Sequence, residues 1–383
     1  MTFQSGEPHC SSSRTAALCA AGPGARGQEI RIDTYTFRDG SVYTGEMQGR
    51  KPGGRGRTVF PGGNVYEGEY VKGKRQGTGT FTFTDGEKYE GEWFQDRQHG
   101  RGTYYFLNNN RYEGMWYTDY QHGHGVMYYY TGDVYDGQWA YDKREGEGTY
   151  TWASGDSYRG EWEDDKKNGY GVFTWADSSR YEGQWRDNVR WGRGTYRYAN
   201  GDVYEGTWAD DMMDGRGRLT YADGDVYEGE YRRGERTGRG TYRTAGGAVY
   251  EGEFRAGLRN GYGVQTTADS VRYEGQWRDD KRHGRGKLTW GKDGANCYDG
   301  TWADDRQEGT GVLILEDGTK YKGGFKDGLE DGKGVRQEPD GTRYEGFFRR
   351  GKKDGPFVEF DREGRLLRRG TYRDGYLDQT AGE

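Results

Sequence analysis

Hydrophobic and polar positions alternate along nearly the whole chain, and the alternation repeats every 23 residues. The spacing lengthens once to 25 residues, at Tyr298, and 23-residue steps then lead to Tyr321, Tyr344 and Leu367. Alternation with a period of two predicts β-strands with one aromatic face, and a fixed period of this length predicts a repeat protein of fourteen units. The tyrosines that begin the first eleven repeats are Tyr43, Tyr66, Tyr89, Tyr112, Tyr135, Tyr158, Tyr181, Tyr204, Tyr227, Tyr250 and Tyr273.

The repeat that begins at Tyr66 contains two predicted strands, with the tyrosine counted as position 1. In residues 66–70 tyrosine and glycine alternate with glutamate, and in residues 77–83 glycine and phenylalanine alternate with threonine. A polar loop over residues 71–76 is expected to join the strands, and a turn such as Asp85-Gly86 to join successive repeats. The predicted fold is all-β: an elongated single-layer antiparallel ribbon of stacked 23-residue β-hairpins.

Three glycines recur in each repeat. Positions 3 and 12 are glycine in all fourteen repeats, and position 14 is glycine in every repeat except the last, where it is Phe357. Glycine weakens a strand unless a neighbouring group needs the space. We therefore predict that aromatic rings lie across bare backbone, with a tyrosine or tryptophan of the next hairpin over each glycine.

Composition narrows the functional classes. Hydrophobic residues make up 31% of the chain, but 34 Tyr, 14 Phe and 12 Trp at fixed positions supply large apolar area. The net charge of −6 comes from 57 basic and 63 acidic residues, which is a mixed surface and not the basic stripe of a nucleic-acid binder. Three cysteines provide no disulfide framework, so a reducing compartment is expected.

The repeats define the predicted domain boundaries. Residues 1–29 are expected to be a disordered tail, with an organellar transit segment as the alternative. Residues 30–42 match the second half of a repeat and are expected to form an N-terminal half-repeat cap, with Arg31 and Asp33 in place of two glycines. Fourteen repeats occupy residues 43–366, and residues 367–383 are a C-terminal partial repeat and tail.

Two sequence motifs resemble MORN repeats: YEGEW at residues 89–93 and YEGQW at residues 273–277. The second is followed by HGRG at residues 283–286. The resemblance covers residues 43 to about 361 and is to the all-repeat class, such as protist cytoskeletal members and radial-spoke-head-like ciliary members. It implies an aromatic groove and a scaffold role at cytoskeleton-membrane junctions. It also implies a cytoplasmic, cytoskeletal location, with a cilium or flagellum as a further expectation.

The partner-binding groove is predicted where positions 5, 16 and 18 are nearly all aromatic, from Phe81 to Tyr221. A helical or extended segment of a protein partner can lay an apolar side on such rings; alternatively, the rings pack only on one another. Trp191 departs from the repeat pattern in a hairpin loop and is a further contact candidate. The predicted groove residues are Tyr89, Trp93, Tyr112, Trp116, Tyr135, Trp139, Trp162, Trp185, Trp191 and Trp208.

The C-terminal repeats invert the polarity of the pattern. Two interpretations stay open, a cap that packs on itself and a self-association surface of a homodimer, formed by Phe347, Phe348, Phe357, Val358 and Phe360. The family resemblance includes dimerisation through C-terminal repeats. Basic residues in the same segment are expected to attract an acidic partner or an anionic phospholipid surface, phosphoinositide included; they are Arg349, Arg350, Lys352, Lys353, Arg368 and Arg369.

Catalytic chemistry is not expected. His99, His122 and His124 are spaced so that they could hold a metal, but no cysteine or carboxylate quartet joins them, and no metal or cofactor is predicted. The glycine pairs are not followed by a helix, so they do not form phosphate loops. The predicted function is a non-enzymatic scaffold; the alternative is an adaptor that binds anionic phospholipid at a membrane-cytoskeleton junction.

Overall fold

The computed structural model describes residues 31–378, so the predicted tail at residues 1–29 lies outside the described residues. The chain divides into two units, an N-terminal half of residues 1–189 and a C-terminal half of residues 190–383. Among residues 31–378, no helical segment has the length and apolar character needed to cross a membrane.

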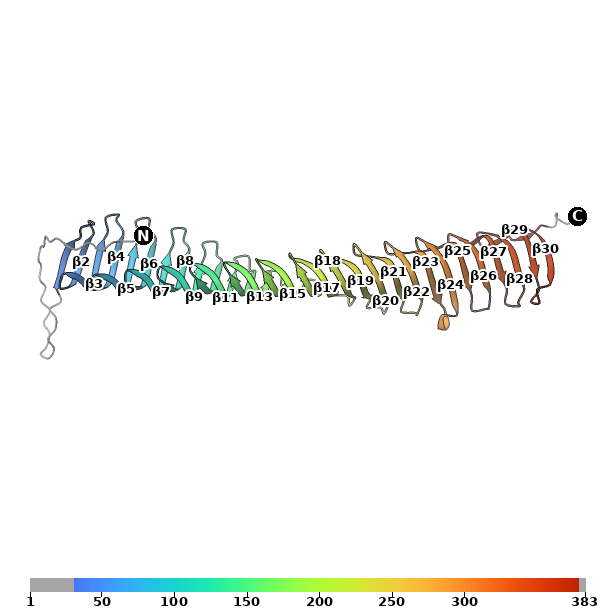
Figure 1. The fold of residues 1–383 in the computed structure, drawn as a ribbon, viewed down its shortest axis with the longest axis horizontal. Coiled ribbons are helices and arrows are strands. Elements are labelled where there is room, and N and C mark those ends of the chain that lie inside the picture. The colour runs from blue at the N-terminus through green and yellow to red at the C-terminus, as the bar shows by residue number, and fades with distance from the viewer. Residues whose placement is uncertain (1–30, 379–383) are drawn as a thin grey trace. The chain divides into compact units, whose positions relative to one another are not determined.

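The N-terminal half is an antiparallel sheet in which each strand pairs with the next one along the chain (Figure 1). Two strands belong to each repeat. The strands are β1 (Arg31–Thr36), β2 (Val42–Gln48), β3 (Lys51–Val59), β4 (Val65–Val71), β5 (Lys74–Thr82), β6 (Lys88–Phe94), β7 (Arg97–Tyr105), β8 (Arg111–Tyr117), β9 (Tyr120–Tyr128), β10 (Val134–Ala140), β11 (Lys143–Thr151), β12 (Ser157–Glu163), β13 (Lys166–Thr174) and β14 (Arg180–Arg186).

Within the C-terminal half, consecutive strands also pair in antiparallel orientation. Its first strand begins at the last residue of the N-terminal half. The strands are β15 (Val189–Arg197), β16 (Val203–Ala209), β17 (Met212–Thr220), β18 (Val226–Arg232), β19 (Glu235–Arg243), β20 (Val249–Arg255), β21 (Leu258–Thr266), β22 (Arg272–Arg278), β23 (Lys281–Trp290), β24 (Asn296–Ala303), β25 (Arg306–Ile314), β26 (Lys320–Lys326), β27 (Leu329–Gln337), β28 (Arg343–Arg349), β29 (Lys352–Phe360), β30 (Leu366–Arg373) and β31 (Tyr376–Leu377).

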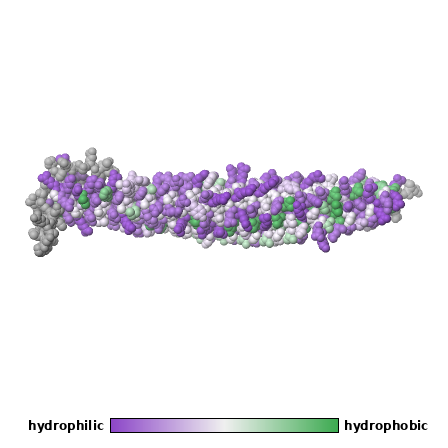
Figure 2. Space-filling model, turned by 60° about the horizontal axis from the view of Figure 1, so that its bottom comes forward, coloured by the Kyte–Doolittle hydropathy of each residue, from purple (hydrophilic) through white to green (hydrophobic). Residues whose placement is uncertain are grey.

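The predicted all-β fold of antiparallel 23-residue hairpins is confirmed. A space-filling view shows a mainly hydrophilic face on which hydrophobic residues form separate groups (Figure 2). The two extra residues before Tyr298 are accommodated by η1 (Lys292–Gly294), a short 3-10 turn between β23 and β24. The insertion therefore lengthens a turn and leaves the strand pairing intact, with Leu288 opposite Tyr298.

The hairpin loop is shorter than predicted. Only Lys72 and Gly73 lie between β4 and β5, with φ of 53° and 86°, which is the positive-φ backbone of a tight two-residue hairpin turn. Arg75 and Gln76, expected in the loop, belong to β5 because the pairing shifts between Gly68 and Tyr70. Gly77, with φ of 79°, lies at this bulge, so the position-12 glycine serves the backbone and not a ring.

The glycines at positions 3 and 14 accommodate a ring, as predicted. Gly68 lies opposite Gly79, and a Cβ on Gly79 would be 2.5 Å from Cζ of Tyr66. The expectation that the ring comes from the next hairpin is wrong, because Tyr66 begins the same repeat. Its side chain leans along its own strand over the glycine pair and donates a hydrogen bond to the Glu69 carbonyl at 3.1 Å.

Side chains on both edges of the sheet join successive repeats. On the hairpin-loop edge, Asp96 Oδ1 accepts a hydrogen bond from the backbone N–H of Arg75 in the preceding repeat, at 2.8 Å. On the opposite edge, Asn110 Oδ1 accepts one from the backbone N–H of Tyr130 in the following repeat, at 2.9 Å. The two side-chain oxygens thus accept from backbone N–H groups at the ends of the strands. Without these acceptors, the N–H groups would have to bond to water.

At the C-terminal end, Leu367 does not take the position of the repeat tyrosine. The pairing between β29 and β30 shifts after Glu359, so that Arg368 lies opposite Glu359 and Leu367 is 56% exposed. Gly370 and Tyr372 then follow where glycine and tryptophan lie in other repeats. The last partial repeat therefore begins one residue later than the sequence spacing predicts.

Candidate partner-binding surfaces

The tyrosines that begin each repeat are part of the packed interior. Tyr89, Tyr112 and Tyr135 are fully buried, and the hydroxyl of Tyr89 donates to the Glu92 carbonyl at 2.9 Å. Burial raises the pKa of Tyr89 well above its ordinary range. These three predicted groove residues therefore contribute packing and no accessible surface.

The tryptophans at position 5 are almost as deeply placed. Each Nε1–H donates to a glycine carbonyl of the preceding repeat, as Trp116 does to Gly102 at 3.2 Å, and the Trp116 indole contacts two repeat tyrosines, Tyr89 and Tyr112. Their exposed fractions are 4–6% for Trp93, Trp116, Trp139, Trp162, Trp185 and Trp208. Trp191, on β15, is half-buried. At positions 1 and 5, the rings therefore pack on one another, which is the second of the two interpretations.

Cationic side chains at position 10 lie on top of these rings. The guanidinium of Arg144 is 4.4 Å from the Trp162 ring centroid and 5.5 Å from that of Tyr150, and its Nε is 3.0 Å from Asp165 Oδ1. The same arrangement recurs at Arg259 and Arg282 in the C-terminal half. A cation held by both a ring face and a carboxylate gains from each contact. Sequence reasoning missed this layer, although an aspartate 21 residues after the position-10 cation, at position 8 of the next repeat, marks it at Arg144 and Arg259.

A row of half-buried rings remains at positions 16 and 18. We call it the aromatic strip. Neighbouring rings of the strip contact one another, as Phe83 does with Tyr104 (5.9 Å), Tyr104 with Phe106 (4.6 Å), Tyr129 with Tyr150 (5.7 Å) and Tyr150 with Trp152 (4.4 Å). The half-buried rings at positions 16 and 18 of the repeats in the N-terminal half are Phe60, Phe83, Tyr104, Phe106, Tyr129, Tyr150, Trp152 and Trp175.

Hydrogen bonds fix two of the strip tyrosines, Tyr104 and Tyr150, in place. The hydroxyl of Tyr104 donates to Glu87 Oε2 at 2.6 Å, and that of Tyr150 donates to Asp133 Oδ2 at 2.9 Å. Burial and the carboxylate partner both raise the pKa of Tyr104, so this phenol stays protonated and remains a donor. The strip is therefore an ordered surface whose ring orientations are set before any partner arrives.

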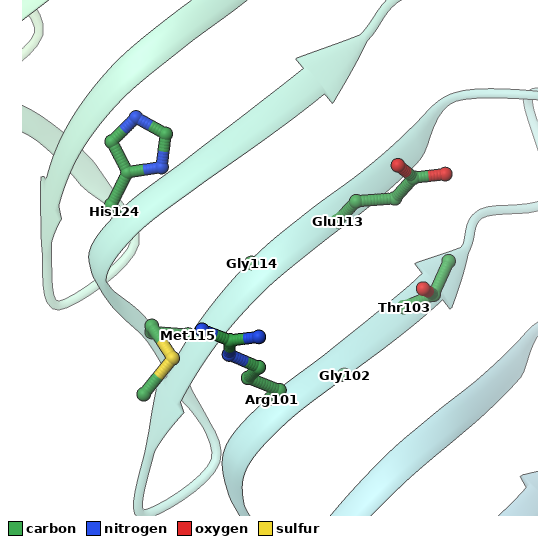
Figure 3. Close-up of a pocket in the computed structure, with 7 residues that line it drawn as sticks. All are labelled: Arg101, Gly102, Thr103, Glu113, Gly114, Met115 and His124. Atoms are coloured by element: carbon green, nitrogen blue, oxygen red, sulfur yellow. The ribbon is translucent and has the colours of Figure 1, made fainter.

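The other face of the sheet carries a shallow pocket of about 400 Å³ over β7, β8 and β9. Figure 3 shows Arg101, Met115 and His124 on one side of it and Thr103 and Glu113 on the other, with Gly102 and Gly114 between them. His124 Nε2 is 3.0 Å from Asp136 Oδ1. Charged and polar side chains line this pocket, whereas aromatic rings form the aromatic strip. Over residues 31–378, no group of three or more His, Cys, Asp or Glu side chains is arranged to bind a metal.

The residues predicted for self-association divide into two classes. Phe348 and Phe357 are 3% and 5% exposed and pack against the last repeat tyrosine, Tyr344. Phe347 is 40% exposed, and Val358 and Phe360 are partly exposed. A second copy would therefore meet Phe347, Val358 and Phe360. Self-association through this end stays a prediction.

Four of the six basic residues predicted to attract lipid or an acidic partner pair with carboxylates of the same chain. Arg349 pairs with Asp354 at 3.9 Å and Lys352 with Asp374 at 3.0 Å, while Lys353 (3.1 Å) and Arg368 both pair with Glu359. Burial alone would raise the pKa of Glu359, but these two cations outweigh it and hold that pKa below its ordinary value. The charge offered to an outside anion is reduced accordingly. Arg350 and Arg369 are both exposed. Lipid binding stays a prediction.

Comparison with known proteins identifies the repeat. A family model described as MORN repeat matches residues 66–88, 89–111, 112–134, 135–157, 158–180, 181–203, 204–226, 227–249, 250–272, 273–294, 298–320, 321–343 and 344–356. No curated protein matches the sequence. The matched segments begin after β2 and β3, although these strands form the same kind of hairpin over residues 42–59.

Two solved structures illustrate the similarity at the level of coordinates. The TCP10 domain of Danio rerio CPAP, in complex with a peptide of STIL, is 10% identical with a TM-score of 0.24, over 81% of this chain and 99% of that chain. The SAS-4 TCP domain of Drosophila melanogaster, in complex with a proline-rich motif of Ana2, is 14% identical with a TM-score of 0.24, over 55% and 96%. Similarities this low carry no argument about function.

Proposed function

Because the chain belongs to the MORN-repeat family, a non-enzymatic module of protein-interaction or membrane-associated roles, we propose that it is a scaffold that binds segments of partner proteins on the aromatic strip. The strip takes the place that the predicted groove gave to Trp93, Trp116 and Trp139, which lie beneath the surface. The proposed place of action is the cytoskeleton, in the cytoplasm or in a cilium or flagellum.

One observation carries the proposal: the strip rings are ordered, contact one another and remain partly exposed in successive repeats. Rings at positions 1 and 5 reach the same face but are buried, so the strip supplies the accessible aromatic area. Apolar side chains of a helical or extended segment would gain about 25 cal/mol for each Å² of apolar surface that they cover there.

The chain itself shows which substitutions at position 18 are compatible with the fold. Repeats 9 and 10 have Thr244 and Thr267 at this position, and repeat 12 has Leu315. A triple variant, Phe83→Thr, Phe106→Thr and Trp152→Thr, therefore removes three strip rings with residues that the repeat already accommodates.

The proposal is tested with peptides selected from a displayed random library on the full-length protein. We expect the triple variant to keep its circular dichroism spectrum and to bind the selected peptides at least about tenfold more weakly, because a loss of about 1.4 kcal/mol corresponds to that factor. The matched control is Leu107→Ala. Leu107 is 66% exposed at a position that is alanine in repeats 5–10, and this variant should bind as the unmodified protein does. Undiminished binding by a folded triple variant would refute the strip as the site.

A further inference from the structure

A second ordered surface lies on the hairpin-loop edge of repeats 3–5. Ring centroids follow one another at 5.6 Å from Phe94 to His99, 5.5 Å to Tyr117, 5.6 Å to His122 and 5.3 Å to Tyr141. Phe94, Tyr117 and Tyr141 are 46%, 47% and 58% exposed. We call these five rings, together with Tyr120 beside Tyr141, the loop-edge ladder.

Other repeats use this edge differently. A basic residue at position 9 forms an ion pair with an aspartate at position 7 of the next repeat, as Lys166 does with Asp187 at 2.7 Å and Arg306 with Asp327 at 2.8 Å. In the ladder the same pair of positions is Tyr120 and Tyr141, with ring centroids 5.7 Å apart. Exposed aromatic rings thus take the place of a solvated ion pair. The packing of the repeat does not require rings at these positions.

The ladder also carries two carboxylates that lack the cation found beside their counterparts. Asp165 is paired with Arg144 of the preceding repeat, as Asp211 is with Arg190. At the two ladder positions the preceding repeat supplies Gln98 and Gln121, and each aspartate accepts a backbone N–H at 2.8 Å. Among residues 31–378, Asp119 and Asp142 have no basic side chain within ion-pair distance, and both are exposed.

The absence of a cation beside Asp119 and Asp142 indicates that the partner of this surface is positively charged. Elsewhere in this chain a guanidinium is held between a ring face and an aspartate, as Arg144 is between Trp162 and Asp165. The ladder presents rings and aspartates without that cation. Position 10, where arginine lies in other repeats, is occupied by the buried side chains of Gln98 and Gln121, which are 8% and 6% exposed. A cation that completes the arrangement must therefore come from outside the chain and approach along the loop edge.

The spacing of the two carboxylates selects the conformation of the partner. One repeat contributes two strands, so equivalent residues recur roughly every 9.6 Å, twice the ~4.8 Å separation of paired strands. A polyproline II segment advances about 9.3 Å in three residues and returns to the same side. An α-helix advances about 10.5 Å in seven residues, and its mismatch with the repeat is about three times larger. A β-strand places residues three apart on opposite faces.

We propose that the loop-edge ladder binds an extended, polyproline II-like segment of a partner protein that carries arginine or lysine at every third residue. The cations lie against Asp119 and Asp142, and their aliphatic stems cross the rings of Tyr117, Tyr120 and Tyr141. His99 and His122 act as spacers between the exposed rings. Their Nδ1 atoms are buried and form no hydrogen bond within residues 31–378. This surface is distinct from the aromatic strip, and neither proposal depends on the other.

The test uses a synthetic peptide with the sequence Arg-Pro-Pro-Arg-Pro-Pro-Arg, titrated into the full-length protein at physiological ionic strength. A second peptide of the same composition, with the three arginines adjacent, has equal charge and the wrong spacing. Calorimetry should give a dissociation constant for the first peptide that is at least threefold lower than for the second. Equal affinities would overturn the proposal, because they would show attraction by net charge alone; no measurable binding of either peptide would overturn it as well.

The variant that removes both charges is Asp119→Asn with Asp142→Asn. Asparagine keeps the backbone hydrogen bond, as Asn188 shows by accepting from the Lys167 N–H at 2.9 Å. We expect this variant to bind the spaced peptide at least tenfold more weakly. Asp187→Asn, which removes an exposed loop carboxylate already paired with Lys166, should bind within twofold of the unmodified protein. Equal binding by the folded double variant would contradict the assignment.

Discussion

Replacing Gly102 by alanine is expected to unfold the hairpins around it. A Cβ at this position would be 2.5 Å from Cζ of Tyr89, a distance that no side chain tolerates. The ring cannot move aside, because it is fully buried, bonded to the Glu92 carbonyl and flanked by Trp93 and Trp116. Overpacking usually costs about 1–3 kcal/mol, and a ring fixed on every side puts this variant at or above about 3 kcal/mol.

Hydrogen exchange measured by mass spectrometry on the full-length protein localises the effect. Backbone amides of β6, β7 and β8 should lose protection in the Gly102→Ala variant, since local opening follows the weakest unit of the array. The control is Gly62→Ala, where an added Cβ has no atom within 4 Å. That variant should change stability by less than about 0.5 kcal/mol, as exposed substitutions do. Equal protection in the two variants would contradict the placement of the ring.

Trp139→Ala is expected to cost about 3–5 kcal/mol, as removal of a buried tryptophan does. The indole is 5% exposed, donates to the Gly125 carbonyl at 3.1 Å, and packs edge-on against Tyr135 (5.1 Å) and Tyr112 (5.4 Å). Its truncation leaves a cavity and an unpaired carbonyl. The stability change is read from thermal denaturation, together with hydrogen exchange over β8 to β11.

Tyrosine is the matched control at this position, because repeat 9 has the 3% exposed Tyr231 there. Trp139→Tyr keeps an aromatic ring at this position and should therefore cost clearly less than Trp139→Ala. A similar loss in both variants would mean that the indole is not packed as described. Because Trp139→Ala is expected to be destabilised, weaker partner binding by this variant is attributed to unfolding unless the variant is shown to be folded.

Most of the fold could be predicted from the sequence, because alternation and period are one-dimensional signals of strand and repeat. The glycines at positions 3 and 14 also indicated a ring over bare backbone. The owner of the ring was not predictable from spacing alone, because Tyr66 and the following Tyr89 both have the right phase. The two-residue turn at Lys72 and Gly73 was hidden by the bulge at Gly77, which moves polar residues into the strand.

The depth of each ring was the main feature that the sequence did not provide. Trp139 and Trp152 belong to the same aromatic face by periodicity, yet one is packed between two tyrosines and the other lies in the strip. Depth depends on contacts between repeats, which a pattern within one repeat does not contain. The ion pair of Arg368 with Glu359 was likewise hidden, because the one-residue shift between β29 and β30 changes which side chains face each other.

The central claim is that position-5 rings hold the sheet together while strip rings meet the partner. Hydroxyl-radical footprinting of the full-length protein, with and without a peptide selected on it, compares both classes within one molecule. The account predicts that Trp152 is oxidised faster than Trp139 and Trp162, and that the peptide slows oxidation of Trp152 alone. Oxidation of all three at one rate, or a Trp152 rate unchanged by bound peptide, would contradict it.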